Sequence, residues 1–130
     1  RWLMQFAVSG SPSAMVSEHT WEPATDVYET PTHLMVKMDV AGLRPSDLRV
    51  NLDHDMLVIR GQRSDAFRSR ACAFRQLEIM TGYFERVIPI DIPIDAANIQ
   101  ARYEAGFLEI AIPKGQQKAA TTLVITIINR

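Results

Sequence analysis

Apolar and polar residues alternate along several stretches of the chain, which is the period-2 pattern of half-buried β-strands. The pattern occupies residues 34–40, 48–52, 57–61, 82–88, 99–103 and 107–112, with a shorter candidate at residues 26–29. No long stretch has the period of an amphipathic helix. About seven short strands joined by turns predict an all-β protein, an immunoglobulin-like antiparallel β-sandwich.

The strongest local signal is a hairpin within residues 99–114. Residues 104–106 separate its two strands, and Gly106 is free to take the positive φ that a tight turn needs. Leu108, Ile110 and Ile112 share one face of the second strand. A two-stranded hairpin is marginally stable alone, so we expect these three side chains to pack against a second layer.

The alternation is lost over residues 62–81, which we call the mid-chain loop. A loop of about 20 residues is long for a compact domain and is usually functional. Its scattered arginines leave RNA binding as one interpretation, but the stacking platform expected for RNA is lacking. An arm that reaches a partner subunit explains the length better. Cys72 lies in this loop, and both a redox-sensitive and an inert thiol remain open.

The two ends of the chain differ from the middle. We expect an N-terminal arm at residues 1–20, a sandwich domain at residues 21–114 and a C-terminal extension at residues 115–130. The arm carries apolar residues and a Ser/Gly/Pro break, so it is either a short helix on the domain's own core or a mobile contact segment. A signal peptide is not favoured there. The apolar, β-prone run at residues 123–128 should fill a groove, on its own domain or a neighbour's.

Composition narrows the possible functions. The 130 residues suit one domain, and 47% hydrophobic residues can build a core. A net charge of −1 argues against an extended nucleic-acid surface. No apolar run approaches the roughly 20 residues that cross a bilayer, so we expect no stable membrane insertion. A single cysteine provides no disulfide framework and favours a reducing compartment, the cytoplasm.

Nothing in the sequence favours an enzyme. A Ser/His/Asp set, a phosphate-cradling Gly-rich loop and a paired-carboxylate motif are all missing, so no catalytic residue and no cofactor are expected. Asp53, His54 and Asp55 could in principle ligate a metal, but a solvated turn is the better interpretation, and no metal site is predicted.

Several motifs, in matching order and spacing, resemble the small heat-shock proteins, the α-crystallin-domain family. They are Trp21-Glu22-Pro23 with Asp26-Val27-Tyr28-Glu29, Asp39-Val40-Ala41-Gly42, Leu57-Val58-Ile59-Arg60-Gly61-Gln62-Arg63, Gly82-Tyr83-Phe84-Glu85-Arg86, and the hairpin with Gly106-Phe107-Leu108 and Ile110-Ala111-Ile112-Pro113-Lys114. The chain departs from the family where Ala41 replaces the usual proline before Gly42.

The resemblance implies an ATP-independent holdase chaperone, which binds partly unfolded client proteins and prevents their aggregation. It also implies a homodimer, formed by a strand in the mid-chain loop that swaps into the partner's sandwich, and possibly a larger homo-oligomer. Cys72, Phe74 and Arg86 are then the expected dimer-interface residues. The planar Arg86 guanidinium suits paired carboxylates. A second reading remains open, in which the sandwich is a CS-domain-like co-chaperone or adaptor for one specific partner.

The resemblance further implies a groove that receives an Ile-x-Ile anchor from the tail. The expected lining residues are Val50, Leu52, Ile99 and Ala101. The expected anchors are Ile125 and Ile127, although neighbouring registers remain open because the run is apolar throughout. The expected client-contact residues of the arm are Trp2, Leu3, Met4 and Phe6.

Overall fold

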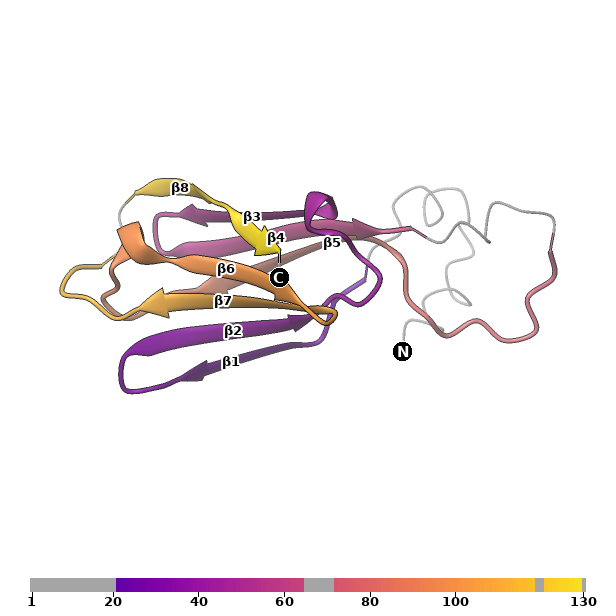
Figure 1. Ribbon diagram of the computed structural model, residues 1–130, viewed down its shortest axis with the longest axis horizontal. Coiled ribbons are helices and arrows are strands. Elements are labelled where there is room, and N and C mark those ends of the chain that lie inside the picture. Colours follow the sequence, from indigo (N-terminus) through magenta and orange to yellow (C-terminus); the bar gives the residue numbers. More distant parts are fainter. Residues whose placement is uncertain (1–20, 65–71, 119–120, 130) are drawn as a thin grey trace.

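The computed structural model describes residues 21–64, 72–118 and 121–129. They form two stacked β-sheets (Figure 1). The first sheet has the order β1 (Thr25–Glu29), β2 (His33–Asp39), β7 (Phe107–Pro113), β6 (Gln100–Glu104) and β9 (Ile127–Asn129). The second has the order β5 (Gly82–Pro89), β4 (Met56–Arg63), β3 (Leu48–Asp53) and β8 (Thr122–Ile125). Two short 3-10 helices, η1 (Pro45–Asp47) and η3 (Ala96–Asn98), lie in connections. The predicted β-sandwich is confirmed.

The core forms because alternate residues of each strand face the other sheet. Leu108, Ile110 and Ile112 of β7 are all fully buried, as the hairpin pattern predicted. They meet buried residues of the opposite sheet within one hydrophobic cluster. The predicted second layer is therefore present. The β3 and β4 residues in that cluster are Leu48, Val50, Leu52, Leu57 and Ile59.

The turn of the central hairpin has positive φ at both central residues, 54° at Ala105 and 86° at Gly106. Glu104 and Phe107 form the last pair of the ladder, so the loop has two residues. Two positive φ values fit the twist of the flanking strands, which is why such turns favour glycine. The prediction for Gly106 is confirmed, and Ala105 adds a strained position that the sequence pattern did not indicate.

The strand number differs from the sequence expectation. The described residues form nine strands, where about seven were predicted, because the tail forms β8 and β9. Neighbouring strands pair antiparallel except β6 and β9, which are parallel. The tail runs antiparallel to β3 and then crosses at Thr126 to the other sheet, where β6 runs in the tail's own direction.

The mid-chain loop leaves the sandwich after β4 and returns at β5. Residues 72–80 of this loop extend away from one end of the sandwich (Figure 1). The described chain begins, at residue 21, near the same end. Pro89 closes β5, which is the edge strand of its sheet, so the missing donor breaks no central ladder.

Candidate functional site

The tail pairs with β3 in one sheet and with β6 in the other, and we call the place that it occupies between these two edges the groove. β8 adds to β3, and β9 adds to β6. Ile125 lies opposite Val50, and Ile127 lies opposite Ala101. One segment of the tail thus extends both sheets and spans the gap between them.

Burial separates the inward from the outward residues of the tail. Ile125 is 8% exposed and belongs to the core, and Ile127 is half-buried against it. By contrast, Val124 is 79% exposed and Ile128 is 52% exposed. The structure therefore places Ile125 and Ile127 in the groove as the inward pair.

Of the four residues that the resemblance suggested as groove lining, Val50 and Leu52 lie in β3, Ala101 lies in β6, and Ile99 directly precedes β6. Val50, Leu52 and Ala101 are buried, and Ile99 is half-buried against the same core. Leu123 also takes part, because it pairs with Leu52 and packs against the core. The sequence reasoning missed Leu123, although two-residue spacing from Ile125 would have indicated it.

The path of the chain into the groove is fixed by close backbone contacts. The Ile94 amide donates to the Gln117 carbonyl at 3.0 Å, and the Gly115 amide donates to the Pro93 carbonyl at 3.1 Å. A Cβ at Gly115 would lie 2.5 Å from the Ile94 carbonyl group, so a side chain does not fit there without a backbone shift. At the start of β8, the His54 amide donates to the Thr121 carbonyl at 2.8 Å.

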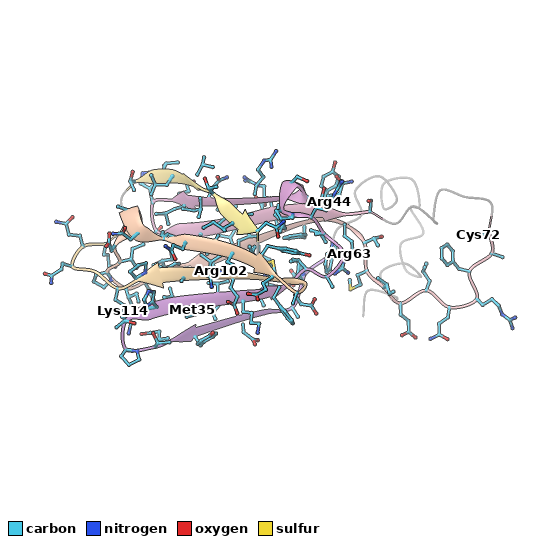
Figure 2. All side chains as sticks on the ribbon, viewed as in Figure 1. Met35, Arg44, Arg63, Cys72, Arg102 and Lys114 are labelled. Carbon is cyan, nitrogen blue, oxygen red and sulfur yellow. The ribbon has the colours of Figure 1, made fainter. Side chains whose placement is uncertain are left out.

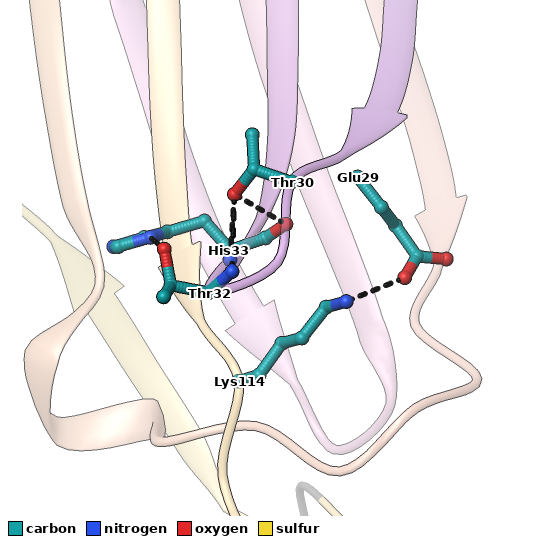
Figure 3. Close-up of polar contacts among 5 residues, drawn as sticks. All are labelled: Glu29, Thr30, Thr32, His33 and Lys114. Carbon is teal, nitrogen blue, oxygen red and sulfur yellow. Dashed lines mark hydrogen bonds and ion pairs between the residues drawn. The ribbon is translucent and has the colours of Figure 1, made fainter.

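The side of the sandwich opposite the tail carries the two other edge strands, β1 and β5. β1 is mostly exposed, including Val27 and Tyr28. Its end is fixed to the end of β7 by an ion pair of 2.9 Å between Lys114 Nζ and Glu29 Oε1 (Figure 3). In the adjoining turn, the His33 amide donates to Thr30 Oγ1 at 2.9 Å. β1 is thus an exposed edge on a rigid frame, the kind of surface to which another strand can pair.

The expected dimer-interface residues lie in two places. Arg86 is in β5, where its Nη1 lies 3.3 Å from Glu22 Oε1. Cys72 and Phe74 are exposed and lie in the mid-chain loop, and Figure 2 shows Cys72 far from the sandwich. The arm residues Trp2, Leu3, Met4 and Phe6 lie outside the described residues.

Two kinds of feature are absent from the described part of the chain. There, no group of three or more His, Cys, Asp and Glu side chains could hold a metal ion. The same residues include no helix long and apolar enough to span a bilayer. What the described chain does offer is two strand edges that an extended apolar segment, the tail, covers.

Known proteins resemble this chain over most of its length. The model of the Hsp20/alpha crystallin family matches residues 26–127. Small heat shock protein C2 of Rickettsia felis is 30% identical over 82% of this chain and 69% of its own length. Among solved structures, hspA from Xanthomonas axonopodis has a TM-score of 0.67 and 34% identity, covering 72% of this chain and 94% of that one. A small heat-shock protein from Xylella fastidiosa, whose structure is described as a distinct high order structure, has a TM-score of 0.68 and 33% identity, covering 78% and 91%.

Proposed function

Because the chain belongs to the Hsp20/alpha crystallin family, whose members are small heat-shock chaperones and not enzymes, we propose that it is an ATP-independent holdase. In this proposal it binds partly unfolded client proteins through apolar surface and keeps them from aggregating. The family match does not favour the adaptor alternative.

The observation that carries the proposal is the way the tail occupies the groove. Ile125 enters the groove from β8, which pairs with β3, and Ile127 enters it from β9, which pairs with β6. An unfolded client presents the same elements, an extended backbone and apolar side chains at alternate positions. Main-chain hydrogen bonds give the groove affinity for any such segment. Two apolar positions accept many different apolar side chains, so they impose little sequence specificity. The groove therefore suits many clients in place of the tail.

The strength of this docking suits exchange. Complete burial of two isoleucine side chains contributes roughly 3–6 kcal/mol before the entropy cost of ordering the tail. Ile127 is only half-buried, which keeps the sum toward the lower end. A tail held this weakly is docked in most copies of the protein, and a competing strand can still displace it from the groove.

Light scattering of a heated client tests the proposal. A heat-labile protein of unrelated sequence is incubated with an equimolar amount of the chain, with and without ATP. We expect scattering to fall by the same amount in both conditions. Undiminished scattering, or suppression that requires ATP, would contradict the holdase proposal.

We also propose that two copies form a homodimer by strand exchange through the mid-chain loop. The support is that residues 72–80 extend away from their own sandwich and that β1 offers an exposed strand edge. Phe74, which is 46% exposed, and Cys72 would then enter the partner's surface, and Arg86 would lie beside the interface. Further assembly into a larger homo-oligomer would use the tail anchor in a neighbour's groove.

Light scattering coupled to gel filtration tests the dimer. We expect Phe74→Ser to lower the average mass toward that of one chain at micromolar concentration. The matched control is Val124→Ser, because Val124 is also exposed and apolar but lies on the outward face of the tail. Equal masses for the two variants would count against the loop as the dimer contact.

Other parts of the proposal follow from sequence. The arm residues Trp2, Leu3, Met4 and Phe6 are proposed to contact clients. The boundaries of arm, sandwich domain and extension are proposed at residues 1–20, 21–114 and 115–130. A cytoplasmic location is proposed from the single cysteine, Cys72, since no disulfide framework is possible within the chain. No nucleic-acid partner is proposed for a chain of net charge −1.

A further inference from the structure

Three segments that are distant in sequence meet at the end of the sandwich from which the mid-chain loop leaves. Arg63 is the last residue of β4, where the loop begins. Met80 and Gly82 lie where the loop returns to β5. Trp21 is the first described residue, and we call it the root of the N-terminal region because the arm is expected at residues 1–20. Figure 2 shows Arg63 at this end, beside the root of the loop.

Arg63 contacts both other segments. Its guanidinium carbon lies 4.2 Å from the centroid of the Trp21 ring, which is cation–π distance. Its Nη1 donates to the Met80 carbonyl at 2.9 Å. One side chain therefore holds the two ends of the loop together and at the same time rests on the indole.

Trp21 contacts the return of the loop independently. Its amide donates to the Tyr83 carbonyl at 3.0 Å, and its indole Nε1 donates to the Gly82 carbonyl at 2.9 Å. The ring also meets Phe84 edge to face, with centroids 5.5 Å apart. These contacts attach Trp21 to β5 at the residues where the loop ends.

The environment of Arg63 makes its contacts depend on one another. Its Nε is buried without a hydrogen-bond partner among the described residues. Burial lowers the pKa of the guanidinium below its ordinary value, while the nearby Asp39 carboxylate acts in the opposite direction. A partly desolvated cation is held in place by its remaining contacts, so the loss of one weakens its hold on the others.

We propose that Arg63 and Trp21 form a clamp that couples the base of the mid-chain loop to the root of the N-terminal region. Displacing the loop removes the Met80 carbonyl from Arg63, and the indole then loses its cation. Conversely, lifting Trp21 exposes Arg63 and the Gly82 carbonyl. Each of the two segments is therefore held more weakly when the other has moved, as linkage requires.

The functional consequence rests on the proposed function. If pairing of the loop with a partner subunit shifts Met80 away from Arg63, it releases the clamp at Trp21, next to the arm that is proposed to contact clients. The clamp itself is a property of the single folded chain. Measurements on the purified chain therefore test it without a client.

Hydrogen exchange of the full chain, measured on backbone amides and overlapping peptides, tests the coupling. Arg63→Gln removes the cation from one side of the clamp. Trp21→Phe removes the indole donor from the other. The matched control is Arg60→Gln, because Arg60 lies on the same strand and loses only an exposed ion pair with Glu85.

We expect each clamp variant to accelerate exchange roughly 5- to 30-fold in two places at once, as befits the loss of a partly desolvated cation–π contact. One is the amide of residue 21, whose acceptor is Tyr83, and the other is the start of β5, which pairs with the end of β4 at Arg63. Arg60→Gln should change neither.

Acceleration at only one of the two places in either clamp variant would overturn the proposal, because the segments would then move independently. Equal acceleration in β2 and β7 would also overturn it, since Arg63 and Trp21 would then stabilise the sandwich as a whole. A chain that shows the paired acceleration but fails to protect a client would refute the proposed function and leave the clamp intact.

Discussion

Replacing the inward pair of the tail tests how the groove is occupied. In the double variant Ile125→Ser/Ile127→Ser, the tail keeps its length and charge but loses its two apolar contacts. Nearly complete burial of Ile125 corresponds to about 2 kcal/mol, and half-burial of Ile127 to about 1 kcal/mol. The docking free energy should therefore fall by about 3 kcal/mol, which lowers the docking equilibrium constant roughly 150-fold.

The matched control is Val124→Ser/Ile128→Ser, which makes the same kind of change on the outward face. These side chains are 79% and 52% exposed, so each substitution should change stability by less than about 0.5 kcal/mol. The two double variants have similar composition, so any difference between them reports the face and not the hydrophobicity of the tail.

The assay is hydrogen exchange at the amide of His54, which donates to the Thr121 carbonyl at the start of the tail strands, together with urea unfolding. The inward variant should lose protection at that amide and unfold at lower urea. Its loss of stability cannot exceed the docking free energy, because unfolding then starts from an undocked tail. Equal effects of the inward and outward pairs, or an inward effect below about 0.5 kcal/mol, would refute this reasoning.

Three further changes test the frame of the sandwich, each by urea unfolding. Gly61→Ala should cost about 1–3 kcal/mol, because its Cβ would lie 2.5 Å from the ring of Phe84; an unchanged midpoint would mean that the ring moves aside freely. Ala105→Gly should add about 0.5–1 kcal/mol, because glycine relieves the positive φ of the turn; a loss of stability would contradict the strain. Lys114→Gln should cost less than about 1 kcal/mol, and the cost should vanish in high salt; persistence at about 1 M salt would show that the pair with Glu29 is not a simple surface ion pair.

Much of the fold could be predicted from local pattern. Alternation predicted that Val36, Met38, Leu52 and Leu57 face the core between the sheets. All four are fully buried. Gly106 indicated the hairpin turn. These predictions succeed because a strand has a side-chain period of two and a turn depends on few residues. Periodicity did not assign the strands to one sheet or the other, and the structure shows that assignment.

The candidate site was harder to predict. The apolar run at residues 123–128 indicated that something must cover it, but its uniform hydrophobicity left the register open. In the structure, Ile125 and Ile127 face inward because their strand pairs with fixed edges of β3 and β6. Arg63 was grouped with the other arginines of the mid-chain loop, since nothing in its neighbours indicates that it rests on Trp21.

The amino-acid sequence alone determined the strands from β1 to β7, their buried faces and the central turn, because each depends on residues that are close together along the chain. Only the tertiary structure decided that the tail joins both sheets, that β9 runs parallel to β6, and that Trp21 binds the carbonyl of Gly82, 61 residues away. Such contacts depend on which edges and ends the packed sheets bring together. No local periodicity specifies these long-range contacts, because they form only when the whole core packs together.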